Sequence, residues 1–350
     1  MHPVSAVKLN VHSLAILLAV SASALAAEAP RLYSEVPAVR QGKTVLWHDP
    51  GVVETKELQY CGGGRSRAPH PSFTFIKEDD AGTNPKIQVR DGAGRHWAVK
   101  FGPEASPDSF ATGLACTLGY YAEPTYYIAD GIILGAHDLK RTKHAIGANG
   151  QFHGGRFQLR AKHPEFLKDV DWSWSQNPFV GTHALNGLKI LMMLTSNWDS
   201  KDIRDAVDRG SNTAVYRNGR QYVFFVDDWG AAMGAWGNLA TRSKWNAGDY
   251  GEQTREFVRG IKDGEIEWGY HGAHTSDVTR GIHVGDVRWL LRYLGRVTDR
   301  QLVAGLRGSG ASDREVSIYV PSIRLRIQQL QRIANSAPAP KMMSKTTAAR

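Results

Sequence analysis

Three short runs between residues 73 and 101 carry apolar side chains at alternate positions. The runs are FTFIKED, KIQVRD and HWAVKF, and turns rich in Gly, Asp and Asn separate them. Strands joined by such short turns pair with their neighbours in sequence. The pattern therefore predicts a small antiparallel sheet in which Trp97 and Val99 face one side and Ala98 and Lys100 face the other.

Apolar residues at helical spacing dominate the later part of the chain. This spacing predicts a helix from about Pro107 to Tyr120, with Asp108 near its N-terminus, and an apolar helix, GLKILMML, capped by Asn186. It also predicts helices in DVRWLLRYLGRV and DREVSIYVPSIRLRIQQLQRIA. The segment EPTYYIADGIIL resembles a strand that turns at Asp130–Gly131, and residues 135–180 are polar and irregular.

The clearest hairpin pattern is TAVYRNGRQYVFFVD, in which Asn218–Gly219 forms the turn. Together the elements predict an α+β chain with a small β-rich lobe and a larger helical lobe, joined near residue 130. The expected parts are a signal peptide (1–27), an N-terminal extension (28–70), a β-rich N-lobe (71–130), a helical C-lobe (131–335) and a disordered tail (336–350).

The N-terminus has the layout of an export signal. Lys8 precedes an apolar run from Leu14 to Val20, and Ala24 and Ala26 provide a cleavage site. The apolar run is short for a membrane span. We therefore expect an exported protein, periplasmic or secreted, with no stable transmembrane helix after cleavage.

Composition narrows the choice of partners. The 350 residues carry a formal net charge of +9, but the basic residues are scattered and do not form a stripe with interleaved aromatics. This distribution argues against a nucleic-acid reader. The two cysteines, Cys61 and Cys116, allow at most one intrachain disulfide, and Cys116 sits at helical spacing among apolar residues.

Four polar positions occur in an order that suits phosphoryl transfer. Lys100 ends a strand, so the sheet can fix its stem while its ammonium group contacts phosphates. Asp199 follows the apolar helix and is the candidate base, and Asn197 braces its loop. Asn212 precedes a strand, and Asp228 ends the apolar run VFFVD, so both are candidate ligands of a divalent cation.

Other residues are weaker candidates for the same chemistry. The turn DAGTNPK places Gly82 and Thr83 where backbone amides can cover phosphates, with Lys86 beside them. Asp108, with Glu104 as a rival, is the candidate partner of Lys100. Asp202 and Asp205 compete with Asp199 for the role of base. Each position also has an ordinary interpretation as a surface lysine, a turn cap or a solvated charge.

The segment HGAHTSD offers a different kind of site. His271, His274 and Asp277 have a spacing compatible with a metal, although the H-E-x-x-H pattern of metalloproteases is missing. No G-x-S-x-G elbow is present, which disfavours a serine hydrolase. A metal-dependent hydrolase therefore stays open as a third hypothesis.

The motifs also resemble those of known atypical kinases. The segment from GTNPKIQVRD through HWAVKF to FATGLACTLGY resembles the N-lobe of HipA-like kinases. YVFFVDDWGAAMG resembles the metal-binding loop of phosphatidylinositol kinases and of secreted Golgi casein kinase relatives. The likeness covers roughly residues 73–235, and the whole chain resembles an uncharacterised group of exported bacterial proteins.

This resemblance implies a two-lobed protein-kinase-like fold and ATP with Mg²⁺ or Mn²⁺. It implies Lys100 on phosphate, Asp199 near the acceptor, and Asn212 and Asp228 on metal. The leading hypothesis is an exported phosphotransferase that moves phosphate from a nucleotide to a hydroxyl acceptor, which can be a protein, a sugar or an envelope component. The alternative is a catalytically inactive kinase-like module that binds a ligand in the cell envelope.

Overall fold

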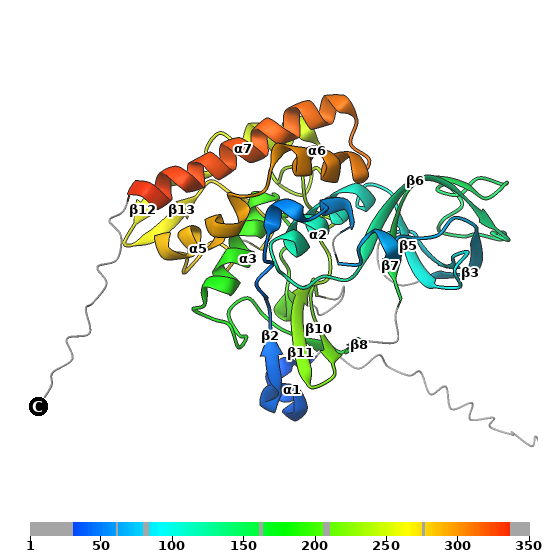
Figure 1. The fold of residues 1–350 in the computed structure, drawn as a ribbon, viewed down its shortest axis with the longest axis horizontal. Helices are drawn as coiled ribbons and strands as arrows, with labels where there is room; N and C mark the ends of the chain where they lie inside the picture. The colour runs from blue at the N-terminus through cyan, green and yellow to red at the C-terminus, as the bar shows by residue number, and fades with distance from the viewer. Residues whose placement is uncertain are drawn as a thin grey trace, which may run out of the picture.

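The computed structural model describes residues 31–60, 62–79, 84–160, 164–205, 211–274 and 277–336. Five strands close into a barrel in the order β3-β4-β5-β7-β6, which lies on the right of Figure 1. Neighbouring strands are antiparallel except β3 and β6, which are parallel. The strands are β3 (Phe73–Asp79), β4 (Lys86–Arg90), β5 (His96–Phe101), β6 (Thr125–Leu134) and β7 (Gln151–Leu159).

Alternation along the strands separates the inside of the barrel from its outer face. Trp97, Val99 and Phe157 are fully buried in the apolar cluster that fills the barrel. Lys100 has the opposite orientation, and its register partners are Lys86 on β4 and Arg156 on β7. A row of three basic side chains therefore crosses three adjacent strands on the outer face.

The barrel packs through helix α2 (Ala105–Thr117) on a larger apolar core. Phe110 and Leu114 of α2 belong to the same buried cluster as α3 (His183–Leu194), in which every residue from Leu185 to Leu194 is buried. The other helices are α1 (Pro37–Gln41), α4 (Ala247–Gln253), α5 (Val284–Leu294), α6 (Asp299–Gly308) and α7 (Asp313–Ser336). Helix α7 runs along the upper edge of the molecule in Figure 1.

Several small sheets accompany these helices. The largest has the order β2-β11-β10-β8 and is mixed, because β2 (Lys43–Val45) runs parallel to β11 (Gln221–Val226) while β10 (Thr213–Asn218) and β8 (Glu165–Phe166) add antiparallel pairs. Two further pairs are β1 (Arg31–Leu32) with β9 (Val170–Asp171), and β12 (Val258–Lys262) with β13 (Glu265–Trp268).

The predicted two-lobed kinase-like fold, with a small antiparallel N-lobe and a larger mainly helical C-lobe, is wrong. The strands close into a barrel that contains a parallel pair, and the remaining chain forms several sheets between its helices. The turn expected at Asp130–Gly131 is absent, because β6 continues to Leu134 and Gly131 packs against the ring of Phe152. Strand β7 arises from a segment that we expected to be irregular.

Other expected elements are confirmed. The three short strands, the hairpin with Gly219 at φ 60°, α2, α5 and α7 all form near their predicted positions. The start of the apolar helix is corrected by one turn. Helix α3 begins at His183, where the Thr182 hydroxyl accepts a hydrogen bond from the Leu185 amide, so Asn186 lies inside the helix.

Some of the predicted segments lie outside the residues that the structure describes. The predicted signal peptide and the terminal tail fall on residues 1–30 and 337–350, which lie outside the described ranges. Within those ranges, none of the helices has the length and apolar character needed to cross a bilayer. Cys116 is disulfide-bonded, and Cys61, the other cysteine of the sequence, lies outside the described ranges.

A candidate phosphotransfer site around Lys100 and Asp228

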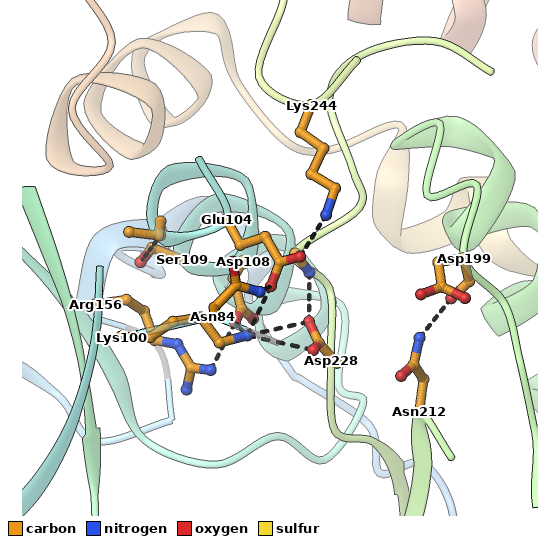
Figure 2. A network of polar contacts seen from close by, with 12 residues as sticks. Asn84, Lys100, Glu104, Asp108, Ser109, Arg156, Asp199, Asn212, Asp228 and Lys244 are labelled. Atoms are coloured by element: carbon orange, nitrogen blue, oxygen red, sulfur yellow. Dashed lines mark hydrogen bonds and ion pairs between the residues drawn. The ribbon is translucent and has the colours of Figure 1, made fainter. Parts of the chain in front are cut away.

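The side chain of Lys100 lies at the centre of a buried ionic cluster at the end of β5. It is 4% exposed, and its ammonium nitrogen is 3.3 Å from carboxylate oxygens of Glu104, Asp108 and Asp228. Figure 2 shows these carboxylates converging on the lysine from two directions. The proximity of Lys100 and Asp228 predicted from the sequence is confirmed, although 128 residues separate them.

The three carboxylates come from two helix-start positions and one strand end. Glu104 directly precedes α2, and Asp108 lies in the first turn of that helix. Asp228 follows β11, where the amide of Gly230 donates a 2.7 Å hydrogen bond to its Oδ1 atom. A Cβ atom at Gly230 would lie 2.8 Å from the Cβ of Glu104, so this close approach requires glycine.

An outer set of polar groups holds the same carboxylates. Arg156 on β7 is buried and contacts Asp108 at 2.7 Å. Lys244 forms an ion pair with Glu104, and the Asn84 amide nitrogen donates to the same carboxylate. Each carboxylate around Lys100 therefore has a further donor of its own, which fixes its orientation.

The cluster keeps its members charged in the folded protein. Burial opposes the charge on Lys100, but the Asp228 and Asp108 carboxylates outweigh it and raise its pKa. Burial also opposes ionisation of Asp228, but Lys100 and the Gly230 amide hold its pKa well below the usual range. Lys86 is different, because burial and the nearby Lys100 lower its pKa.

The loop that carries Asp199 is attached to the Asp228 segment through Asn197. The buried Asn197 side chain donates to the backbone oxygen of Asp228 at 3.5 Å and accepts from the Asp199 amide at 3.3 Å. The Asn212 side chain donates to the Asp199 backbone oxygen at 2.6 Å. In Figure 2, Asp199 and Asn212 lie together on the opposite side of Asp228 from Lys100.

The donors near Asp228 have the chemistry that a hard divalent cation requires. The Asp228 side chain is 36% exposed, so part of its carboxylate is accessible. The amide nitrogen of Asn212 is occupied by the Asp199 carbonyl, which leaves the side-chain oxygen as the available donor. These oxygen donors fit Mg²⁺ or Mn²⁺. The described residues contain no group of three or more His, Cys, Asp or Glu side chains arranged to hold a metal.

The rivals of Asp199 are engaged elsewhere. Asp202 is fully buried, accepts a hydrogen bond from the Trp174 amide at 2.9 Å and pairs with Arg204. Asp205 contacts His274 at 3.2 Å. Asp199 is 27% exposed and lies 3.6 Å from the Lys201 ammonium. Asp205 is somewhat more exposed, at 32%, but the Asp199 amide is the one that donates to Asn197, which contacts the Asp228 backbone.

Of the other predicted binding residues, some lie beside Lys100 and others do not. Asp108 contacts Lys100, as expected for its partner, and Glu104 does so too. Lys86 lies beside Lys100 on the adjacent strand. Gly82 and Thr83 lie outside the described residues. In the HGAHTSD segment, Asp277 pairs with Arg204 and His274 with Asp205, and His271 is exposed.

Sequence reasoning missed Arg156, Lys244 and a carboxyl pair behind the cluster. Arg156 follows Gly154 and Gly155, and these two glycines interrupt the alternation of apolar and polar residues that would identify β7 as a strand. Burial and the neighbouring Asp227 carboxyl, which shares a hydrogen bond with it, raise the pKa of Glu123 to about 8. Burial and Asp228 likewise raise the pKa of Asp227. No local pattern marks Lys244, which lies in an irregular segment.

Comparison with known proteins gives no identification. No protein-family model matches the chain, and no curated protein matches it at a significant level. The geometry described above therefore carries the functional argument.

Proposed function

We propose that this protein is an exported phosphotransferase that moves a phosphoryl group from a nucleotide, ATP, to a hydroxyl acceptor. The observation that carries the proposal is the convergence of Lys100 and Asp228 at 3.3 Å, with Asn197 joining the Asp228 backbone to the Asp199 loop. A buried lysine, a strand-end aspartate and a nearby accessible carboxylate are the parts that positional catalysis of phosphoryl transfer uses.

Each residue has a defined role in the proposed reaction. Lys100 moves from Asp228 toward phosphate oxygens while Glu104 and Asp108 keep its ammonium group oriented. Asp228 and Asn212 would hold a divalent cation, which would supply charge neutralisation for the phosphates. Asp199 accepts the proton of the acceptor hydroxyl as the acceptor oxygen bonds to the terminal phosphorus and the bond to the nucleoside diphosphate breaks.

Two further observations support parts of the proposal. The short motifs around Lys100 and Asp228 resemble those of HipA-like and phosphatidylinositol kinases, and this likeness supports the chemistry. The disulfide of Cys116 supports export, because disulfides persist mainly in oxidising compartments such as the periplasm or the extracellular space.

A thermal-shift titration with ATP and Mn²⁺ tests the proposal. The mature wild-type protein is compared with Asp228→Asn and with Asp138→Asn, whose side chain is 96% exposed and remote in sequence from the cluster. A ligand at a hundred times its dissociation constant adds about 2.7 kcal/mol of stability. We expect a metal-dependent shift in wild type and in the control, and its loss in Asp228→Asn.

Transfer of labelled γ-phosphate separates the enzyme from a binding module. Metal-dependent release or transfer that Asp199→Asn reduces by 100-fold or more supports catalysis. Nucleotide binding without turnover favours the alternative of an inactive binding module in the envelope. The absence of any shift with nucleotide and metal would refute the nucleotide site itself.

A further inference from the structure

A polar cavity of about 360 Å³ lies beside the loop that carries Asp199. Its walls include Trp174, Ser200, Arg204, Asp205 and His274, together with Asp277. The volume falls in the range of small-molecule sites. Most of these side chains are also accessible, with exposures of 49% for Arg204, 37% for His274 and 23% for Asp277.

The cavity wall and the Asp199 loop form one bonded unit. The Ser200 hydroxyl donates to the His274 backbone oxygen at 2.6 Å, and the Trp174 indole donates to the Ser200 backbone oxygen at 2.8 Å. The Ala273 amide donates to the Trp198 backbone oxygen at 2.8 Å. Ser200 directly follows Asp199, so its Cα lies about 3.8 Å from that of the proposed base. The cavity therefore borders the loop that carries the proposed base, although the Asp199 side chain does not itself line it.

The lining offers both donors and acceptors of hydrogen bonds. Asp205 binds one ring nitrogen of His274 at 3.2 Å, and this contact orients the other ring nitrogen. Arg204 is paired with Asp277 and with the buried Asp202, so its charge is already balanced. The carboxylates of Asp205 and Asp277 disfavour an anionic ligand by like-charge repulsion. Hydroxyl groups, which donate and accept, match this mixed lining.

We propose that this cavity is the acceptor subsite and that it binds a hydroxyl-rich small molecule of the sugar or polyol class. The inference rests on the proposed phosphotransfer and narrows its acceptor from three classes to one. A compact concave site suits a monosaccharide-sized ligand, whereas a protein acceptor is generally recognised over a broader surface. His274 and Asp277 bind and position the ligand, and one ligand hydroxyl has to extend beyond the cavity wall at Ser200 to give its proton to Asp199.

Saturation-transfer NMR with D-glucose, D-glucosamine and glycerol as probes tests the subsite directly. We expect at least one probe to bind wild type and to bind at least tenfold more weakly to Asp277→Asn and His274→Gln. The matched control is His137→Gln, because His137 also contacts an aspartate but is 78% exposed away from the cavity lining. Circular dichroism and the melting temperature confirm that each variant is folded.

The outcomes separate this inference from the proposed function. Binding of a probe that the cavity variants weaken, together with a phosphorylated probe after incubation with ATP and Mn²⁺, supports both. A failure of all probes to bind, or equal binding to wild type and both cavity variants, overturns the subsite even if ATP binds and turns over. Probe binding that is retained in Asp228→Asn, with no nucleotide shift in wild type, refutes the phosphotransfer and with it the acceptor role.

Discussion

Replacing Lys100 by methionine isolates the electrostatic core of the site. Methionine keeps most of the apolar stem while removing the ammonium group that contacts three carboxylates. Arg156 still pairs with Asp108, and Lys244 still pairs with Glu104. The carboxylate that loses its ion-pair partner is therefore Asp228.

The magnitude follows from burial. Breaking a fully buried ion pair by removing one partner costs about 3–5 kcal/mol, because the remaining charge stays uncompensated. The Asp228 side chain is 36% exposed, so water screens part of that charge. We expect Lys100→Met to reduce the free energy of unfolding by about 2–3 kcal/mol at pH 7.

The sign of the pH dependence is also defined. In wild type, the lowered pKa of Asp228 gives stability that is present above the unfolded value of about 3.9 and is lost as pH falls through the folded value. In the variant, Lys100 no longer opposes the effect of burial, and we expect the pKa of Asp228 to rise above its unfolded value even though the Gly230 amide and Arg156 still lower it. A carboxyl group with a raised pKa destabilises the folded variant when it is ionised and stops doing so once it is protonated, below pH ~4. The stability deficit of the variant relative to wild type therefore shrinks as pH falls from 7 toward 4.

Urea unfolding at pH 7, 5.5 and 4.5 measures this deficit, with circular dichroism and tryptophan fluorescence as two probes of the same transition. The matched control is Lys86→Met on the adjacent strand. Lys86 is half-buried and its pKa is lowered by burial and Lys100, so its removal relieves repulsion and changes stability by less than about 1 kcal/mol. A Lys100→Met deficit below about 1 kcal/mol, or one independent of pH, refutes the reasoning.

Two further predictions test polar groups outside the Lys100 ion pairs, the partly buried Glu123 and the buried Arg326. Because burial and Asp227 raise the pKa of Glu123 to about 8, wild type loses stability as pH rises from about 4.3 toward 8. Glu123→Gln should therefore gain melting temperature relative to wild type between pH 5 and 8 and level off above that range, and a constant difference would contradict the assignment. Arg326 is 1% exposed, donates to the Leu194 backbone oxygen at 2.8 Å and lies 3.8 Å from the Tyr250 ring centroid. Lysine cannot reproduce its planar array of donors, so Arg326→Lys should lose about 2–4 kcal/mol in urea unfolding, whereas the same change at exposed Arg217 should lose less than about 1 kcal/mol.

Local patterns identified the parts of the site that lie within single elements. Alternation in HWAVKF placed Lys100 on the face opposite Trp97, and the break of VFFVD at Gly230 placed Asp228 at a strand end. The strand register and the end of β11 at Val226 confirm both placements, and the two side chains meet at 3.3 Å. The roles of Asp199, Asn212 and the remaining site residues stay predictions, because their geometry permits the chemistry without testing it.

The fold could not be derived in the same way, because barrel closure depends on pairs that are distant in sequence. Phe73 on β3 pairs in parallel with Ile133 on β6, and Lys100 on β5 pairs with Arg156 on β7. Strand β7 contains two adjacent glycines and shows little alternation of apolar and polar residues. The composition of Asp130–Gly131 predicts a turn. Instead, Gly131 lies inside a continuous strand, where the absence of a side chain lets the ring of Phe152 pack against its backbone.

The charge balance of the cluster gives a reason for its proposed cation dependence. Lys100, Arg156 and Lys244 face three carboxylates, so the cluster is close to neutral without a ligand. A nucleotide triphosphate brings several negative charges, and Lys86 adds only one more positive charge on the same face. A divalent cation at Asp228 would compensate most of the remainder and would free Lys100 from Asp228 for the phosphates. Nucleotide binding should therefore depend on metal, and Asp228→Asn, which removes one carboxylate charge, should weaken metal-dependent binding more than metal-independent binding.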